Sequence, residues 1–358
     1  MIRGKGVNLG QWLGYLSFLI SLYVIWEIQH LLLLFFTAIV FATILNRLVR
    51  RIQRFGLSRN QAVITTLLLT LVVVMLFVGL IVPPFVEQFQ KLLELLPEVW
   101  DRMRIQLLSL QSQSQQWEWL PPLPPLADLV QKLPPVGTEL LKNFVAFFSN
   151  SFLALLELLL VIILTIMLLI NPRLYRQGLL KLFPSFYRRR AEEILTLSEK
   201  SLSSWIEGII ISSVFVGTCS GIGLSILGIN LILVHALLAG LLNFIPNIGP
   251  TASVIFPVAI ALLEDPWKIG AIVILYVVIQ NLESYLVTPT IMAQQVSLLP
   301  AVTLIAQVFF AQTFGLLGLL LALPLTVIVK TWIEEVLLKD ILDGWQLSSK
   351  SSGLPEAK

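Results

Sequence analysis

Long apolar stretches alternate with short polar segments along most of the chain. They fall at residues 13–26, 31–45, 60–82, 152–170, 205–227 and 269–287. Most of them approach the roughly 20 apolar residues that a helix needs to cross a bilayer, so the pattern predicts an all-α polytopic membrane protein. The first two stretches are together too long for one span, and we expect them to form a helical hairpin that turns at residues 27–30.

Two further apolar runs, 231–263 and 301–333, are equal in length and too long for one straight span. Each follows a single span and is interrupted by proline and glycine, so we predict about eight hydrophobic helical segments, two of them broken. If both runs are re-entrant, residues 205–263 and 269–333 form an inverted repeat, as in many secondary transporters, and loop 264–268 lies outside. If both runs cross fully, that loop lies inside.

The first broken run is interrupted by the octapeptide NFIPNIGP, which begins at Asn243. Pro246 and Pro250 each remove a backbone donor, and Gly249 allows the chain to turn. Asn243 and Asn247 add side-chain amides at the same place. Irregular backbone at membrane depth is tolerated only inside protein or beside a water-filled cavity, so we interpret the octapeptide as part of a solute path. The alternative is a proline-kinked helix without a functional opening.

The second broken run is interrupted in a comparable way. It carries the sequence FGLLG, which contains Phe314, Gly315 and Gly318, and then Pro324. Glycine and proline interrupt helical hydrogen bonding here as they do in the octapeptide. We therefore expect both interruptions to line one substrate path, with alternating access about the octapeptide and residues 314–324.

Ionisable and amide side chains within apolar stretches are candidates for ion coupling, because such groups are costly in a membrane. Glu283 lies near the end of its predicted span beside Asn281, and Gln280 shares its helix face at a spacing of three residues. A carboxylate there would bind Na⁺ or carry a proton; the alternative is an interfacial ion pair with a cytoplasmic Lys or Arg. His235 in the first broken run is a further candidate, although a lone histidine in a helix is more often a hydrogen-bonded packing residue.

Basic residues identify the cytoplasmic segments. Residues 46–60 contain Arg47, Arg50, Arg51, Arg54 and Arg59 and no acidic residue, and residues 173–204 include an arginine triplet at 188–190. Short loops rich in Lys and Arg stay on the cytoplasmic side, so residues 84–148 are predicted outside. Both termini are then cytoplasmic, in a bacterial inner membrane.

These features divide the chain into five regions. We predict three N-terminal membrane helices, an extracytoplasmic segment, a fourth helix with its basic loop, a transport core and a disordered tail, at residues 1–83, 84–148, 149–204, 205–340 and 341–358. The extracytoplasmic segment is small for a core of its own, so we expect it to pack on the membrane face or on neighbouring subunits.

Small residues recur at every fourth position in the fifth apolar stretch. The ladder consists of Ser213, Gly217, Gly221 and Ser225. Small side chains at this spacing let a second helix approach closely. The partner helix belongs either to the same subunit or to another copy in a homo-oligomer, which we expect the protein to form.

Composition narrows the possible functions. Apolar residues make up 57% of the chain and charged residues 13%, and the mean hydropathy is +0.88. One cysteine rules out a Cys-based zinc site, and no H-E-x-x-H motif, phosphate-binding loop or nucleophile elbow is present. We therefore expect no enzyme activity, no cofactor and no ATP motor, so that uphill transport depends on an ion gradient. No basic patch with interleaved aromatic residues indicates nucleic-acid binding, and the expected partners are membrane lipid and a small-molecule or ion substrate.

Several of these motifs together resemble a known family. The octapeptide, the sequence QNLE ending at Glu283, Pro289, Pro300, the FGLLG element and Pro324 resemble the autoinducer-2 exporter family of permeases. The resemblance extends from the first apolar stretch to about residue 335. It implies export of a small polar signal, and some members of the family resemble sodium/proton antiporters.

The sequence therefore leads to one main hypothesis and one alternative from another class. The main hypothesis is a secondary transporter that exports a small polar solute or exchanges cations. The alternative is a channel-like or structural membrane assembly in which the broken helices pack subunits together.

Overall fold

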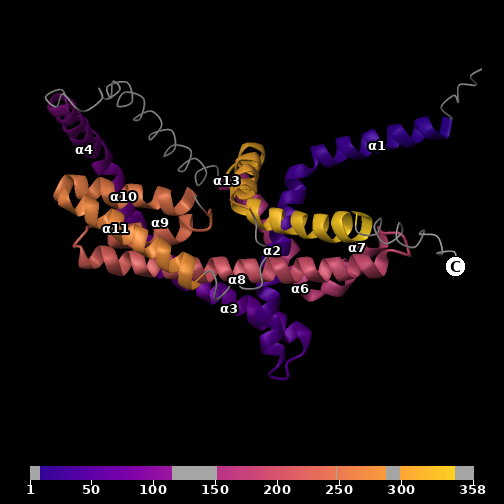
Figure 1. The fold of residues 1–358 in the computed structure, drawn as a ribbon. Coiled ribbons are helices and arrows are strands. Elements are labelled where there is room, and N and C mark those ends of the chain that lie inside the picture. Colours follow the sequence, from indigo (N-terminus) through magenta and orange to yellow (C-terminus); the bar gives the residue numbers. More distant parts are fainter. Residues whose placement is uncertain (1–8, 115–150, 247, 288–298, 343–358) are drawn as a thin grey trace, which may run out of the picture.

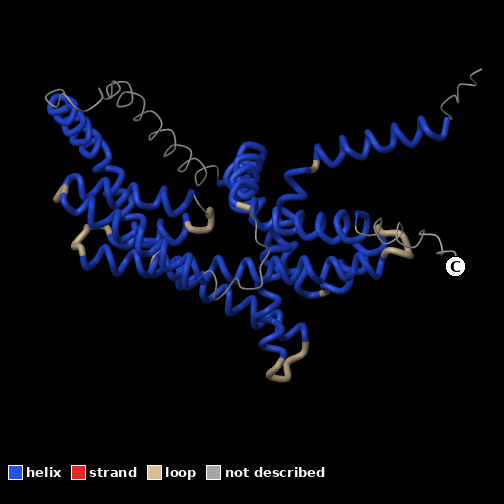
Figure 2. The backbone as a smooth tube through the Cα atoms, viewed as in Figure 1, coloured by secondary structure: helices blue, strands red, loops and turns tan. Residues whose placement is uncertain are grey.

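The computed structural model describes residues 9–114, 151–246, 248–287 and 299–342, and every regular element in these ranges is helical (Figure 2). In chain order the elements are α1 (Leu9–Glu27), α2 (Gln29–Gln53), α3 (Arg59–Leu80), α4 (Val82–Ser114), α6 (Ser151–Ile170), α7 (Pro172–Lys181), α8 (Arg188–Ile226), α9 (Ile232–Leu242), α10 (Ile248–Glu264), α11 (Trp267–Leu282), η1 (Glu283–Val287), α13 (Pro300–Trp332) and η2 (Ile333–Leu342) (Figure 1). The predicted tail after residue 342 lies outside the described residues.

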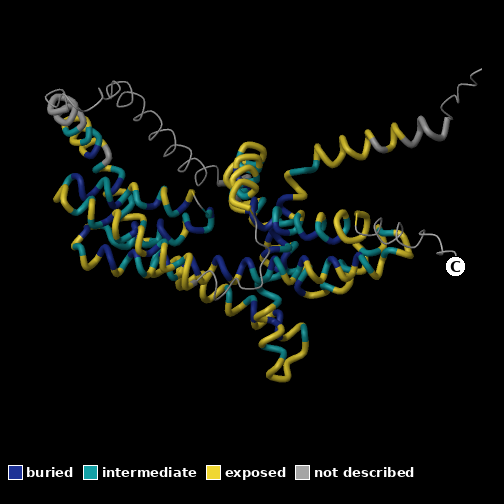
Figure 3. Tube along the Cα trace, in the orientation of Figure 1, coloured by how far each residue is buried: buried dark blue, intermediate teal, exposed yellow. Residues whose placement is uncertain are grey.

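Among the described residues, five helical segments are long and apolar enough to cross a membrane, and the bent pair α6–α7 makes a sixth candidate. The five are α2, α3, α8, α11 with part of η1, and α13 with η2. The protein is therefore an all-α polytopic membrane protein, as the apolar pattern predicts. Exposed apolar side chains follow most of α1 and α3, whereas buried positions concentrate around α8 and its neighbours (Figure 3).

The predicted hairpin at the N-terminus is wrong. Helical hydrogen bonding continues through the bend at Ile28, because its N–H donates to the carbonyl of Val24 and its carbonyl accepts from Leu32, both at 3.0 Å. Beyond the bend α1 extends away from the other helices (Figure 1). The segment 27–30 contains neither glycine nor proline, so nothing in it forces the chain to reverse.

Pro83 and Pro84 stand at the start of α4, just after α3 ends at Leu80. The first turn of a helix tolerates proline because its N–H groups have no intrahelical partner. From this start α4 packs Phe85, Phe89 and Leu92 against the core formed by α8–α11. α4 thus packs on its own subunit, and the expectation that the segment also covers the membrane face or a neighbouring subunit stays a prediction. Residues 115–148 lie outside the described residues.

The basic segment before residue 205 and the fifth apolar stretch form one helix, the 39-residue α8. Its small-residue ladder packs against α9 of the same subunit. A Cβ atom at Gly217 would lie 3.1 Å from the carbonyl oxygen of Ala236, and one at Gly240 would lie 3.0 Å from that of Ser213. The ladder therefore lets α9 run back along α8 at close range, while its last member, Ser225, is exposed.

Residues 231–263 form a hairpin of two short helices, α9 and α10. At its two ends, the side-chain amide of Asn230 donates to the carboxylate of Glu264, and Lys268 donates to the carbonyl of Gly228 at 3.2 Å. The run therefore begins and ends at the same end of α8. Arg102 of α4 donates to the carbonyl of Leu263 at 3.2 Å, which places the predicted extracytoplasmic segment at this end too. This geometry favours the re-entrant alternative over a full crossing.

A single cysteine at Pro266, in a Cys219→Ser background, is expected to react with a membrane-impermeant thiol reagent added to intact cells. Pro266 is exposed in the connection between α10 and α11, at the end of α8 that lies beside α4. A cysteine at Phe55, which is 82% exposed in the basic loop after α2, serves as the control and should react only after permeabilisation. Reaction of both positions only after permeabilisation would contradict the re-entrant arrangement.

The second broken run is interrupted within α13. Gly315 has φ +62° and ψ −144°. Residues that carry a Cβ atom rarely adopt this conformation, whereas glycine adopts it readily. The chain folds so tightly there that a Cβ at Gly318 would lie 2.1 Å from the carbonyl oxygen of Phe310. Beyond this bend Leu321, Leu323 and Val327 pack with α2 and α8 in one apolar cluster.

Candidate functional site

The octapeptide interrupts the helix because its two prolines remove two donors. Pro246 cannot donate to the carbonyl of Leu242, and Pro250 cannot donate to that of Pro246. The chain satisfies both acceptors by other means. Ile245 N–H donates to Leu242 at 2.8 Å in a tight turn, and the side-chain amide of Gln307 donates to Pro246 at 3.0 Å. Buried carbonyls need such partners, so the break in α9–α10 is stabilised by a residue from the second broken run.

Gly249 is required by the close approach of two backbone segments. A Cβ atom added there would lie 1.8 Å from the carbonyl oxygen of Leu242 and 3.1 Å from the amide nitrogen of Asn243. Any side chain would therefore overlap the end of α9. The glycine lets α10 begin directly against α9, which shapes the hairpin tip.

A chain of hydrogen bonds joins the hairpin tip to α8 and to the end of α11. The side-chain amide of Asn243 donates to Ser212 Oγ at 2.8 Å, and the Ser212 hydroxyl donates to Glu283 Oε1. Gln280 Nε2 donates to the other carboxylate oxygen, Oε2, at 2.6 Å. Asn243 and Ser212 are each 3% exposed, so this end of the chain lies within the packed unit, while Gln280 and Glu283 are half-buried. We refer to Asn243, Ser212, Glu283 and Gln280 as the polar chain.

Glu283 is the charged member of the polar chain. Among the described residues it forms no ion pair with any Lys, Arg or His. The structure therefore does not contain the salt bridge to a cytoplasmic Lys or Arg that was the alternative interpretation. Its carboxylate accepts neutral hydrogen bonds from Ser212 and Gln280. A carboxylate in this setting has lone pairs left to bind a monovalent cation or a proton.

The structure brings together only some of the predicted site residues. Asn281 is exposed and donates to the carbonyl of Val277 in its own helix at 2.7 Å. His235 is fully buried in α9, and no hydrogen bond links it to the polar chain within the described part of the protein. Asn247 lies outside the described residues.

The helix that carries the second interruption contacts the first interruption. Phe314 packs on the same apolar cluster as Phe244 of the octapeptide, and Pro324 is buried in the helix that follows Gly315. Gln307 makes the direct contact and was not predicted. It is fully buried, and its Oε1 has no hydrogen-bond partner among the described residues. The sequence carried one signal for it: Pro250 leaves a carbonyl that needs a donor from elsewhere.

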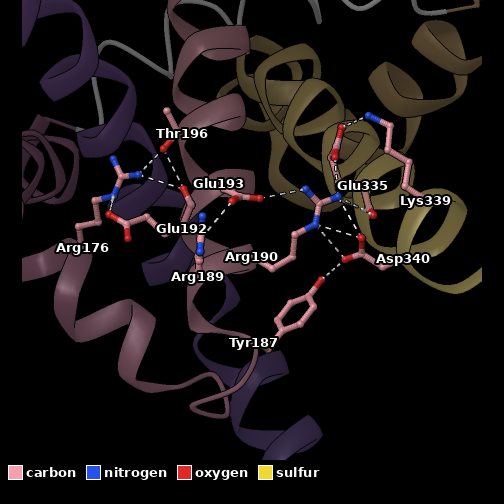
Figure 4. A network of polar contacts seen from close by, with 10 residues as sticks. All are labelled: Arg176, Tyr187, Arg189, Arg190, Glu192, Glu193, Thr196, Glu335, Lys339 and Asp340. Atoms are coloured by element: carbon pink, nitrogen blue, oxygen red, sulfur yellow. Dashed lines mark hydrogen bonds and ion pairs between the residues drawn. The ribbon is translucent and has the colours of Figure 1, made fainter. Parts of the chain in front are cut away.

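A second polar network lies away from these residues, at the start of α8 (Figure 4). Arg190 pairs with Glu335 at 2.8 Å and with Asp340 at 3.0 Å, which fastens η2 to α8. Tyr187 donates to Asp340 at 2.7 Å. Burial, with this hydrogen bond, raises the pKa of Tyr187 to about 12, so the phenol stays protonated and keeps donating. Sequence reasoning assigned these arginines only to membrane orientation.

Comparison with known proteins shows where the chain belongs. The AI-2 transport protein TqsA of Escherichia coli K12 is 27% identical over 307 residues, which cover 84% of this chain and 85% of TqsA. The protein sll0060 of Synechocystis, named provisionally as a transport protein, is 26% identical over 86% of this chain and 89% of its own length. The similarity to YueF and YrrI of Bacillus subtilis spans 42% and 44% of those two proteins.

The sequence pattern of the AI-2E family transporters matches residues 15–338. That range includes all of α2 to α13, and with them both interruptions and the polar chain. The chain therefore belongs to the AI-2E transporter family.

Proposed function

We propose that this membrane permease is a secondary transporter that exports a small polar solute against its gradient, with Glu283 as the ion-coupling carboxylate. The observation that carries the proposal is the polar chain. It connects a group that can bind or release an ion to the tip of a broken hairpin, which is the arrangement that coupling requires. The AI-2E family and the name of TqsA support transport of a signalling molecule as the starting hypothesis.

The polar chain supports a specific coupling step. With Glu283 ionised, every hydrogen bond of this chain is donated towards the carboxylate. The Asn243 amide donates to Ser212, and the Ser212 hydroxyl donates to Glu283. Protonation turns one carboxylate oxygen into a donor, and a bound cation takes the place of a donor, so either event breaks this order. Ser212 then holds Asn243 less firmly and the hairpin tip is released. Alternating access follows if that release opens residues 243–250 and 314–324 to the other side of the membrane.

The sodium/proton antiporter alternative is supported by the same carboxylate, because a cation site needs no separate solute. The chain offers no phosphate-binding loop, so an ion gradient is the energy source in both versions. Exposed apolar side chains on α3 support burial against lipid or a further copy of the chain. We propose a homo-oligomer in the bacterial inner membrane, with both termini in the cytoplasm.

Purified protein in liposomes loaded with autoinducer-2 is expected to release it with saturable kinetics only when a Na⁺ or pH gradient is imposed. A parallel assay follows ²²Na⁺ uptake driven by a pH gradient without the solute. Flux of ²²Na⁺ without autoinducer-2 would favour the antiporter. Non-saturable solute flux that ignores both gradients would indicate a channel, and absence of any flux above that of protein-free liposomes would contradict transport and favour the structural assembly.

A further inference from the structure

The helix pair α6–α7 bends by 93° at Asn171 and Pro172. Asn171 has φ −131° and ψ 61°, outside the helical region, and Pro172 has no N–H to continue the hydrogen bonding of α6. α6 is long and apolar enough to count as part of a candidate span. A helix perpendicular to that span lies along the membrane surface, so the bend places α7 at the membrane–water boundary.

α7 has one polar face, which contacts α8, and one apolar face, as a helix at the membrane surface requires. On one face Arg176 pairs with Glu199 of α8 at 3.4 Å. It also donates to the carbonyl of Glu192 at 3.1 Å, and these contacts fix α7 on α8 (Figure 4 shows Arg176 beside Glu192). Large apolar side chains point away from the protein in and after α7: Leu174 is 66% exposed, Leu182 80% and Phe186 87%. An amphipathic helix held this way presents its apolar side chains to lipid.

A cavity of about 470 Å³, largely open to solvent, lies between the end of α7 and the start of α8. Three basic side chains line it, Lys181, Arg188 and Arg189, with Glu192 as the one acidic residue. Within the described residues Lys181 has no ion-pair partner, and Arg189 is 94% exposed and forms a long ion pair with Glu193 at 3.8 Å. Arg188 uses its Nε to donate to the carbonyl of Phe183. These cations are therefore available to an anion from outside the chain.

We infer that this cavity binds the phosphodiester of an anionic phospholipid. Lys181, Arg188 and Arg189 supply the charge that a phosphate oxygen requires, and Ser185 and Gln177, which also line the cavity, supply neutral hydrogen bonds to the rest of the headgroup. The apolar side chains of Leu182 and Phe186 lie next to the cavity in sequence and give the acyl chains a surface. A free phosphate ion would use the same cations and make no use of the apolar residues.

The test compares lipids bound to the full-length protein. Native mass spectrometry after exchange into defined detergent–lipid mixtures is expected to show that phosphatidylglycerol binds at least about tenfold more tightly than phosphatidylcholine. The triple variant Lys181→Gln, Arg188→Gln, Arg189→Gln should lose this preference. A matched variant, Arg51→Gln, Arg54→Gln, Lys200→Gln, removes the same charge from exposed basic positions outside the cavity and should keep it.

Two further measurements distinguish the phosphate of a lipid headgroup from a free phosphate ion. Leu182→Asn combined with Phe186→Asn is expected to weaken phosphatidylglycerol binding and to leave competition by inorganic phosphate unchanged. The inference is overturned if the matched variant loses the preference as fully as the triple variant does. It is also overturned if inorganic phosphate binds while phosphatidylglycerol binds no better than phosphatidylcholine. All positions changed are exposed, so folding can be verified by size-exclusion chromatography of each variant.

Discussion

Glu283→Gln is expected to abolish ion-coupled flux and to leave the protein folded. The substitution keeps the size of the side chain and its ability to accept a hydrogen bond from Ser212. It removes the negative charge that attracts a cation and the group that takes up a proton, since an amide is uncharged and takes up no proton at physiological pH. Solute flux driven by a Na⁺ or pH gradient should therefore fall to the level of protein-free liposomes.

A matched control separates coupling from the general loss of a carboxylate in a membrane helix. Glu157 of α6 is also a carboxylate within an apolar stretch, but its partner is His30 at 3.1 Å and it takes no part in the polar chain. Glu157→Gln should retain coupled flux. If Glu283→Gln retained coupling as well, with the same dependence on ion concentration, the carboxylate would not carry the ion and the proposed mechanism would be rejected.

The Tm of Glu283→Gln in detergent, measured by thermal unfolding, tests whether Glu283 supports function or stability. Glu283 is half-buried and has no counter-ion among the described residues, and shielding a carboxylate from water without one is costly. Its replacement by a neutral isostere should therefore not lower the Tm, and should raise it if the cost is large. Loss of coupling with an unchanged or raised Tm is the pattern of a functional group. Loss of both would indicate that Glu283 supports the fold.

The apolar pattern predicted the helices well because a membrane span has a simple chemical requirement. The ends of α3 and α6 lie close to those expected from the stretches 60–82 and 152–170. The breaks in the two long runs were also predictable, since Pro246, Pro250 and Gly315 act on their own backbone.

Errors arose where a change in polarity was taken for a change in structure. The polar segment at 27–30 and the charged residues 188–204 interrupt the apolar pattern, yet neither contains glycine or proline. α1 therefore passes into α2 through a bend, and α8 runs on for 39 residues. Polarity determines what surrounds a helix, while backbone chemistry determines where it ends.

The candidate site was half predictable. Gln280 and Glu283 share a helix face, so their contact followed from local spacing. Ser212 lies 71 residues from Glu283 and 31 from Asn243, and nothing in the sequence pairs them. Such contacts depend on how α8, α9 and α11 pack, which a single sequence does not specify. His235 shows the converse, because a titratable side chain in an apolar run drew attention and yet stands apart from the polar chain.

Gly249→Ala is expected to lower the free energy of unfolding by about 3 kcal/mol, which is the upper part of the usual range for overpacking. The added Cβ would lie 1.8 Å from the carbonyl oxygen of Leu242, and this neighbour is backbone that no rotamer change can move. α10 must therefore shift away from α9. Thermal unfolding of the purified protein measures the effect as a lowered Tm.

Gly270→Ala in α11 is the matched control, because a Cβ there meets no atom within 4 Å. It should leave the Tm unchanged or raise it, since alanine favours a helix over glycine by up to about 1 kcal/mol. The displaced α10 in Gly249→Ala also moves the hairpin tip, so Asn243 should lose its contact with Ser212 and coupled flux should fall together with stability. Equal Tm values for the two variants would show that the tip is not closely packed, and an open tip would leave the polar chain without the rigid hairpin that coupling needs.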